Sequence, residues 1–342
     1  MTEITLSAEQ TAAVRAAEGP ALILAGAGSG KTRVITERVA YLVSALGADP
    51  REILAVTFTN KAADEMRRRI EERIGGHARQ AWVMTFHALC VRILRRHPED
   101  AGLARAFVIW DQDECLNLVK RSITSMGLQD KLYAPRRVLS LLSMQKNGRA
   151  WSEADVRDYR LEVLNELAGR YGAGLRAANA VDFDDLLAFT ARLLEESDVL
   201  DRDAGLVFRY ILVDEYQDTN RLQYRIVRAL ASVHKNITVV GDEDQSIYSW
   251  RGADIRNILE FERDFPGAAI LRLEENYRST QAILDAASGL VARNESRIGK
   301  TLRAMRAGGQ RVENLVARDE YEEALRVATD IQRNGEGRSR SG

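Results

Sequence analysis

The stretch that decides the fold is Ala21-Leu22-Ile23-Leu24-Ala25-Gly26-Ala27-Gly28-Ser29-Gly30-Lys31-Thr32. Its first five residues form an apolar run that predicts a buried strand, and the segment from Lys31 to Leu46 has the period of a helix that opens on Gly30. In a glycine-rich loop between a strand and a helix, backbone N–H groups can converge on phosphate oxygens, and the helix N-terminus adds partial positive charge. The stretch therefore predicts a phosphate-binding loop in an α/β domain.

Each residue of this loop has an expected task. Lys31 would reach the β- and γ-phosphates of a nucleoside triphosphate, and the Thr32 hydroxyl would ligate Mg²⁺. The remaining loop residues would surround the phosphates: Ala25, Gly26, Ala27, Gly28, Ser29 and Gly30. Ala25 stands where the usual pattern has glycine, a mild departure because the position mostly needs a small side chain. The alternative is a glycine-rich turn with a chance Lys-Thr pair, but the flanking strand and helix favour the phosphate site.

Further apolar runs follow along the chain, separated by stretches of helical period. They are residues 53–58, 82–85, 210–214, 237–241 and 269–273. None of them alternates between apolar and polar residues, which is typical of parallel strands covered on both faces. The pattern predicts an α/β fold with a parallel sheet.

Between about Asp111 and Arg192 the strand signals disappear and helical periods dominate. We expect an all-helical insertion at residues 111–180, which divides one α/β domain into residues 1–110 and 181–273. The tail of residues 334–342 has no apolar residue and is expected to be disordered.

Carboxylates and an amide follow other strands of the expected sheet. Asp214 and Glu215 end an apolar run, so Asp214 could hold Mg²⁺ and Glu215 could polarise the attacking water. Two surface acids after a strand are common, but together with the phosphate loop they favour a triphosphatase. Gln245 follows another strand and is a candidate sensor of the γ-phosphate; Arg278 could stabilise charge on that phosphate, or could simply face solvent.

Aromatic and polar residues occur at the same strand ends. They are Phe58, Asn60, His87, Tyr248, Trp250 and Arg251. Aromatic rings beside basic groups could form a platform on which nucleic-acid bases stack. The alternative for each ring is packing inside the domain. Their shared position after strands that also carry the phosphate site favours a linked nucleic-acid surface.

Composition restricts the remaining possibilities. The 342 residues carry a formal net charge of −1, so any DNA-binding surface must be a local patch. Two cysteines, Cys90 and Cys115, form no CxxC pair; reduced thiols are expected, with one disulfide as the alternative. The histidines lack metal-ligand spacing, and we find neither a signal peptide nor a membrane-spanning run. We expect a cytoplasmic protein that binds no membrane.

In this order, the motifs resemble those of the UvrD/Rep/PcrA group of superfamily-one DNA helicases. The matching segments are Leu6 to Gln10, Ala25 to Thr32, Val56 to Ala63, Thr85 to His87, Val181 to Leu187, Val213 to Asn220, Val240 to Ala253 and Glu275 to Thr280. They extend over nearly the whole chain to about Ile331, and the family's usual small residue stands at Ala25. A nuclease-associated subunit of the AddA/RecB kind shares several of these motifs, but Glu215 to Asn220 favours the UvrD-like branch.

The resemblance implies a RecA-like domain, a role for each matched residue, and movement 3′ to 5′ along one DNA strand. Gln10 would read the adenine of ATP, Tyr277 would stack on it and Arg33 would contact the nucleotide. Phosphate chemistry would involve Lys31, Thr32, Asp214, Glu215, Gln245 and Arg278. Contacts to single-stranded DNA would come from Phe58, Asn60, His87, Tyr248, Trp250 and Arg251. Junctions of single- and double-stranded DNA are the implied substrate, and repair or replication proteins are possible partners.

The chain is shorter than members of the family, which are about twice as long. We expect a second RecA-like domain to begin at residue 274 and to run to residue 333, with Val312 to Val316 as its first strand after a helix from Gln281 to Arg293. A separate partner could supply the rest of that domain. By the same resemblance, the chain is either a helicase motor or a nucleotide- and DNA-binding module that cannot unwind alone.

For the chain as given, we expect binding of Mg-ATP with slow hydrolysis that single-stranded DNA stimulates little. The reason is that the family's second domain supplies an arginine to the ATP from across the cleft. An ATPase assay with and without single-stranded DNA checks this expectation, and turnover at the level of a full helicase would contradict it.

Overall fold

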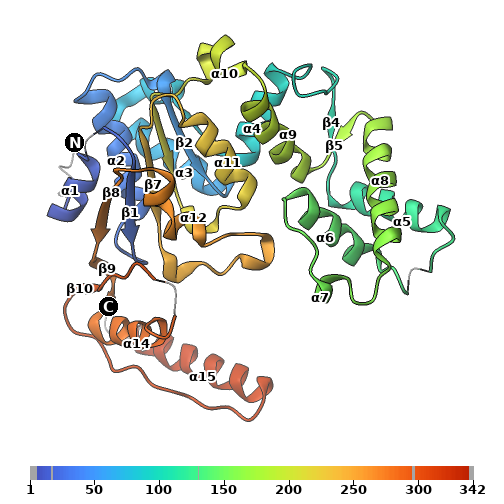
Figure 1. The fold of residues 1–342 in the computed structure, drawn as a ribbon. Coiled ribbons are helices and arrows are strands. Elements are labelled where there is room, and N and C mark those ends of the chain that lie inside the picture. The colour runs from blue at the N-terminus through green and yellow to red at the C-terminus, as the bar shows by residue number, and fades with distance from the viewer. Residues whose placement is uncertain (1–5, 17, 130, 295–296, 339–342) are drawn as a thin grey trace.

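The computed structural model describes residues 6–16, 18–129, 131–294 and 297–338 of the chain. Its centre is a six-stranded sheet in the order β3-β2-β6-β7-β1-β8, and each pairing between neighbours is parallel (Figure 1). The strands are β1 Ala21–Ala25, β2 Ile53–Thr57, β3 Trp82–Thr85, β6 Tyr210–Val213, β7 Ile237–Gly241 and β8 Ala269–Leu273. The α/β fold with a parallel sheet is therefore confirmed.

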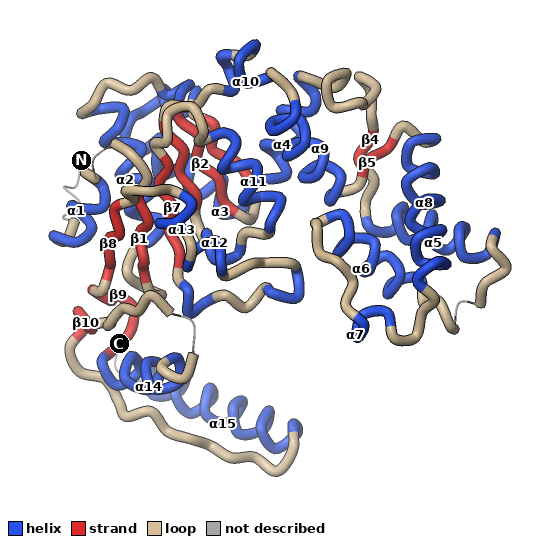
Figure 2. Tube along the Cα trace, in the orientation of Figure 1, coloured by secondary structure: helices blue, strands red, loops and turns tan. Residues whose placement is uncertain are grey.

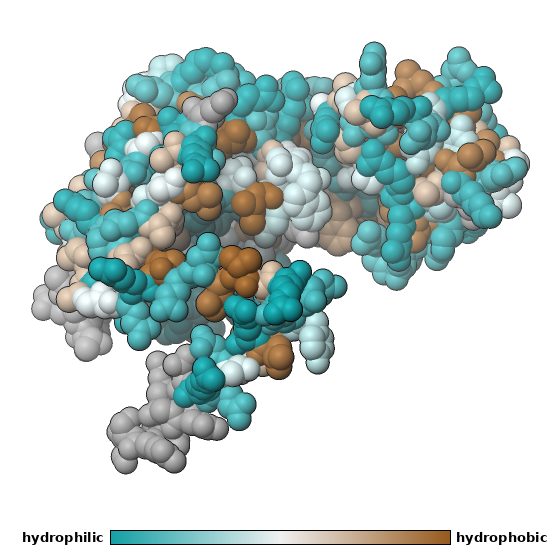
Figure 3. Space-filling view, turned by 90° about the horizontal axis from the view of Figure 1, so that it is seen from below, coloured by the Kyte–Doolittle hydropathy of each residue, from teal (hydrophilic) through white to brown (hydrophobic). Residues whose placement is uncertain are grey.

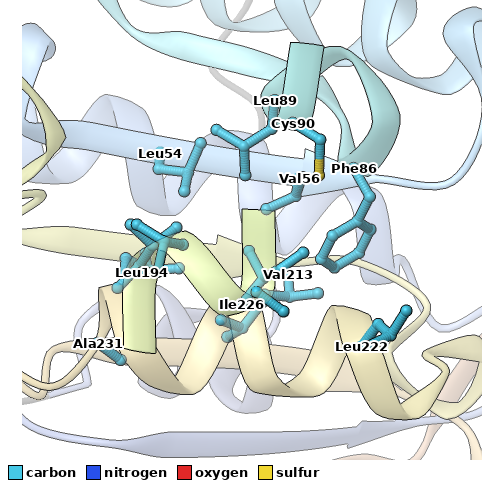
Figure 4. Close-up of a cluster of buried hydrophobic side chains, with 14 of the residues drawn as sticks. Leu54, Val56, Phe86, Leu89, Cys90, Leu194, Val213, Leu222, Ile226 and Ala231 are labelled. Carbon is cyan, nitrogen blue, oxygen red and sulfur yellow. The ribbon is translucent and has the colours of Figure 1, made fainter. Parts of the chain in front are cut away.

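Helices cover both faces of this sheet, which explains why its strands are apolar without alternation. On β1, Leu22 and Leu24 face one hydrophobic core, whereas Ile23 and Ala25 face the other. The second core contains side chains of α1 Ala8–Val14, α2 Lys31–Ser44 and α3 Asn60–Ile74. The first core contains side chains of α4 Phe86–Arg96, α9 Phe183–Glu196, α11 Arg221–Leu230, α12 Arg256–Leu259 and α13 Phe261–Asp264. Figure 4 shows this first core, with Val56 and Val213 of the sheet beside Phe86, Leu194 and Ile226 of the helices.

The helical insertion forms a lobe with its own core. The chain enters it through β4 Val108–Ile109 and leaves through β5 Ala180–Val181, and these two strands pair in parallel (Figure 2). Its helices are α5 Gln112–Ser125, α6 Pro135–Lys146, α7 Glu153–Val156 and α8 Leu161–Ala177. Lys146 of α6 forms ion pairs with Asp182 at 2.6 Å and Asp185 at 2.7 Å, at the start of α9. The lobe is thus tied to the sheet domain at the point where the chain returns. A short helix, α10 Val199–Arg202, then precedes β6.

The C-terminal segment lies below the carboxyl edge of the sheet in Figure 1. It consists of β9 Glu275–Thr280, α14 Gln281–Val291, β10 Arg303–Arg306 and α15 Glu320–Arg338. β10 pairs in parallel with β9. Several apolar side chains of this segment are exposed, among them Leu290 and Leu315, and Figure 3 shows hydrophobic surface between hydrophilic side chains from this side.

One expectation for this segment is wrong. The strand expected at Val312 to Val316 is absent: these residues form neither helix nor strand, and the first strand after α14 is β10. A strand needs a neighbouring strand to which its backbone can hydrogen-bond. Within the described residues the small sheet consists of β9 and β10, so residues 312–316 have no strand partner there and their apolar side chains are exposed. The disorder expected from residue 334 onward stays a prediction, and the structure describes α15 as far as Arg338. Residues 339–342 lie outside the described part.

Two further features concern the possible disulfide and possible membrane-spanning helices. Cys90 and Cys115 are both free and buried, and they belong to different cores, which excludes a disulfide between them. Within the described ranges, no helix has the length and apolarity needed to cross a membrane.

Arg38 of α2 fixes the position of α1. Its side chain is buried, and Nη1 donates hydrogen bonds to the carbonyl oxygens of Val14 at 3.0 Å and Ala16 at 3.1 Å, at the C-terminal end of α1. A cation is favourable there because the last carbonyl groups of a helix carry partial negative charge. Burial lowers the pKa of this guanidinium. Since α1 carries Gln10, Arg38 also sets the place of that side chain.

We predict that Arg38→Met lowers the free energy of unfolding by about 2–4 kcal/mol, because it leaves buried carbonyl oxygens without their charged donor. Urea denaturation at neutral pH measures the change. Arg51→Met is the matched control, since Arg51 is exposed and pairs with Asp49 two residues away; it should leave the free energy of unfolding nearly unchanged. Equal losses in the two variants would contradict the role of Arg38.

Candidate nucleotide and nucleic-acid site

The loop between β1 and α2 has the conformation that its glycines were expected to permit. Gly28 and Gly30 have φ angles of +79° and +93°, which residues other than glycine adopt only with strain. The Ser29 hydroxyl donates to the carbonyl oxygen of Gly26 at 2.7 Å and closes the turn. The loop therefore ends at the N-terminus of α2, where Lys31 is the first helical residue. Ala25 is the exception among the expected loop residues, because it is the last residue of β1 and its side chain lies in the core.

The ends of β1 and β6 bring four expected residues together. Lys31 Nζ lies 2.5 Å from Glu215 Oε2, and the Thr32 hydroxyl donates to Asp214 Oδ2 at 3.2 Å. Glu215 has φ 49° and ψ 45°, a left-handed conformation that costs a non-glycine residue of order 1–3 kcal/mol. A strained backbone conformation persists only where contacts of the fold stabilise it. In this conformation the Glu215 side chain points toward Lys31.

Burial and neighbouring charge control the carboxylates of this site. Burial, and next the charge of Glu215, raise the pKa of Asp214 to about 6. The same two causes raise the pKa of Asp218 to about 6. One oxygen of Asp218 is buried without a hydrogen-bond partner among the described residues. Sequence reasoning did not select Asp218, although it lies in the same acidic motif.

The oxygens near Thr32 suit a magnesium ion. A hydroxyl and a buried carboxylate are hard oxygen ligands of the type that Mg²⁺ takes beside phosphate groups. Thr32 and Asp214 already lie within hydrogen-bond distance of each other, beside the loop that would hold the phosphates. The donor set therefore fits the metal that was expected there.

Gln217 joins this group to the end of β7. Its side chain is buried; Nε2 donates to Glu215 Oε2 at 2.9 Å, and Oε1 accepts from the backbone N–H of Asp242 at 2.9 Å. The expected sensor Gln245 is near, and its amide donates to the carboxylate of Asp242. Sequence reasoning missed Gln217, since an amide two residues after the acidic pair of Asp214 and Glu215 carries no signal of its own.

The expected adenine side of the site is built from α1 and β9. Gln10 is 2% exposed, and its Nε2 donates to the carbonyl oxygen of Ser29 at 2.9 Å. The backbone N–H of Tyr277 donates to the carbonyl oxygen of Gly28 at 3.0 Å, while its ring is exposed. Arg33 is half-buried in the first turn of α2, and the exposed Arg278 follows Tyr277. The structure thus brings Gln10, Tyr277 and the loop together.

Asn276 is a third residue that sequence reasoning missed. Its side chain is buried, and Nδ2 donates to the carbonyl oxygen of Ala27 at 2.5 Å. Its Oδ1 accepts from the backbone N–H of Arg278 at 2.9 Å and of Ser279 at 2.7 Å. One amide therefore fastens β9 to the phosphate loop. The approach of β9 to the loop is close, because a Cβ added to Gly28 would lie 2.6 Å from the Cβ of Arg278.

The expected nucleic-acid residues fall into two aromatic groups. After β2 and β3, Phe58 packs edge-on against Phe86, and His87 packs edge-on against Phe183, with centroid distances of 5.7 Å and 5.5 Å. Burial lowers the pKa of His87. Phe183 is 51% exposed and was not selected from the sequence, although its segment was recognised as a motif. Asn60 is exposed at the start of α3.

The second aromatic group follows β7. The rings of Tyr248 and Trp250 are 6.3 Å apart, and Trp250 is 69% exposed. A tryptophan this exposed is unusual for core packing and suits a binding surface. The side chain of Arg251 lies outside the described residues.

Comparison with known proteins agrees with this geometry. Residues 6–266 match the family model of the UvrD/REP helicase N-terminal domain, and residues 271–341 match that of the UvrD-like helicase C-terminal domain. The chain is 43% identical over 336 residues to the ATP-dependent DNA helicase PcrA of Staphylococcus aureus, covering 96% of this chain and 46% of that protein. It is 47% identical over 330 residues to the protein of the same name from Leuconostoc citreum, covering 95% of this chain and 44% of that protein. The chain thus spans less than half the length of these relatives.

Proposed function

Because this chain belongs to the UvrD/REP helicase family, we propose that it binds and hydrolyses ATP between the ends of β1 and β6 and that this drives movement on single-stranded DNA. The observation that carries the proposal is the pairing of Lys31 with Glu215 and of Thr32 with Asp214 beside the phosphate loop. Movement 3′ to 5′ and unwinding at a duplex junction are proposed for the whole motor, since the relatives named as DNA helicases are about twice as long.

Phosphate binding would rearrange the ion pair that the structure contains. The γ-phosphate would compete with Glu215 for the Lys31 ammonium, because phosphate oxygens are strong acceptors of charge-assisted hydrogen bonds. Glu215 would then be free to accept a proton from the attacking water, while Gln217 keeps the carboxylate oriented. Arg278, exposed beside the loop, would stabilise charge that develops on the phosphate. Mg²⁺ held by Thr32 and Asp214 would neutralise phosphate charge.

Nucleotide recognition would use hydrogen-bonding capacity that remains on the Gln10 amide. Oε1 accepts from Ser7 N–H and Nε2 donates to Ser29, but an amide oxygen has two lone pairs and the NH₂ group has two N–H donors. Reading adenine could therefore use the second donor and the second lone pair while these hydrogen bonds hold the side chain in place. Tyr277 is already exposed next to the loop, so its ring could stack on a base without rearrangement.

Single-stranded DNA would contact the aromatic residues at the strand ends. The candidate rings are Phe58, His87, Phe183, Tyr248 and Trp250. Stacking on such rings does not depend on base sequence, which suits a protein that moves along DNA. The alternative function, a nucleotide- and DNA-binding module without motor activity, uses the same residues and differs only in turnover.

We predict that Glu215→Gln slows ATP hydrolysis by about 10²- to 10⁴-fold and leaves the affinity for Mg-ATP nearly unchanged, because the amide has the same shape but cannot accept the proton. Steady-state ATPase rates and a titration with a fluorescent ATP analogue measure the two effects. Glu166→Gln, an exposed carboxylate on α8, is the control and should change neither. Equal loss of binding and hydrolysis in Glu215→Gln would show that this side chain does not activate water.

We predict that Trp250→Ala weakens binding of single-stranded DNA by roughly 1–3 kcal/mol, the usual contribution of one stacked base. Fluorescence anisotropy with a labelled oligonucleotide measures the affinity. Trp250→Phe is the matched variant and should retain most of it, because a phenyl ring still stacks. An unchanged affinity in Trp250→Ala would assign this ring to packing instead.

A further inference from the structure

The stretch from Arg297 to Leu302, which follows α14 in the C-terminal segment, lies against the sheet domain. Ile298 packs on the first core, and Arg272 Nε of β8 donates to the carbonyl oxygen of Gly299 at 3.0 Å. Leu302 packs directly on the phosphate loop, since a Cβ on Gly26 would lie 2.6 Å from one of its methyl groups. This short stretch therefore touches the proposed ATP site although it begins 265 residues after Thr32, the last residue of the loop motif (297 − 32).

Lys300 is the most buried cation of this stretch. Its side chain is 2% exposed, and Nζ lies 2.6 Å from Asp242 Oδ1, 3.0 Å from Glu243 Oε2 and 2.9 Å from Asp244 Oδ2. Burial acts to lower the pKa of this ammonium, but the charge of Asp242 and its neighbours outweighs it and the pKa is raised. Arg297 adds a second cation, with Nε 2.7 Å from Asp244 Oδ1.

These three carboxylates need the cations. An oxygen from each of them lies within 4.8 Å of the others, a spacing that could also hold a metal ion, but the Lys300 ammonium contacts all three. Asp242 and Glu243 are buried and Asp244 is partly buried, so without a cation the three carboxylates would repel one another, and an unpaired buried carboxylate is strongly unfavourable. The geometry of the Asp242 to Gln245 turn thus depends on a residue from the C-terminal segment.

Asp242 connects this ion cluster to the ATP site by two routes. Its carboxylate accepts from the amide of Gln245, the proposed sensor of the γ-phosphate. Its backbone N–H donates to Gln217, which holds Glu215, the partner of Lys31. A change at Lys300 would therefore reach both the sensor and the residue that is proposed to activate water.

We propose that Lys300 is a positioning residue for ATP recognition: by pairing with Asp242 it holds the Gln245 amide in register with the γ-phosphate, and so makes the sensor depend on docking of residues 297–302. This inference rests on the proposed function, because it takes Gln245 as the sensor. A purely structural role for Lys300 would lower stability without altering how the protein distinguishes ATP from ADP.

The test compares the affinities of the full 342-residue chain for Mg-AMP-PNP and Mg-ADP, which differ in the γ-phosphate. Lys300→Met is expected to lower the preference for AMP-PNP over ADP by about tenfold, the loss of roughly one hydrogen bond to a charged group, with little change in ADP affinity. Lys300→Arg keeps the charge and should restore most of the preference. Gln245→Ala should produce the same loss, and the double variant Lys300→Met with Gln245→Ala should lose no more than either alone.

Lys146→Met is the matched control, because Lys146 is also a largely buried ammonium between carboxylates but lies in the helical lobe. It should lower thermal stability and leave the nucleotide preference unchanged. If Lys300→Met does not fold, Lys300→Gln combined with Glu243→Gln removes one charge of each sign and still takes the cation from Asp242; it should show the same loss of preference.

The outcomes separate the two hypotheses. If Gln245→Ala lowers the preference and folded variants of Lys300 do not, the inference is overturned while the sensor role stands. If the effects of the two residues add fully, Lys300 does not act through Gln245, and the inference is also overturned. If Gln245→Ala itself leaves the preference unchanged, the sensor role in the proposed function is wrong, and the inference falls with it.

Discussion

The ion pair between Lys31 and Glu215 is the contact on which the rest of the site depends. It joins the loop after β1 to the end of β6 across a sequence separation of 184 residues. These two residues meet because the strands are parallel, so that all their carboxyl ends lie at one edge of the sheet. The helical lobe between them in the sequence does not separate them, because the chain enters the lobe and leaves it through the paired strands β4 and β5. The strands that carry these residues are buried between a hydrophobic core on each face of the sheet.

Amide side chains extend this contact into a network around the phosphates. Gln217 links Glu215 to Asp242, Asn276 links the loop to β9, and Gln10 links the loop to α1. An amide suits such positions because it donates and accepts at once without adding charge to a site that must receive a highly charged ligand. The phosphate loop is therefore held by α1 and β9, two segments far apart in the sequence, while Gln217 connects the carboxylate that pairs with Lys31 to the end of β7.

The C-terminal segment also contacts this network. β9 and residues 297–302 contact the loop through Asn276 and Leu302, and Lys300 reaches the acids after β7. In the proposed motor, the two sides of the nucleotide site would move relative to each other while the contacts between them respond to the bound state. Polar and ionic contacts of this kind can serve that purpose, because they have a defined geometry that is lost when the partners separate.

The sequence by itself determined the family, the α/β class and the six strands of the central sheet. The apolar runs, the loop from Ala25 to Thr32 and the motifs around Asp214 and Gln245 were sufficient, and the family match confirms the resemblance to the UvrD/Rep/PcrA group. These features are local, because strand burial and loop conformation depend on consecutive residues. Tertiary structure alone decided the partners of each residue: that Gln245 binds Asp242, that Gln217 and Asn276 hold the site, and that Lys300 neutralises Asp242. It also decided that β10, and not the apolar run at 312–316, pairs with β9. The physical reason is that hydrogen bonds and ion pairs between distant segments depend on where the whole fold places them, and a residue's immediate neighbours do not encode that position.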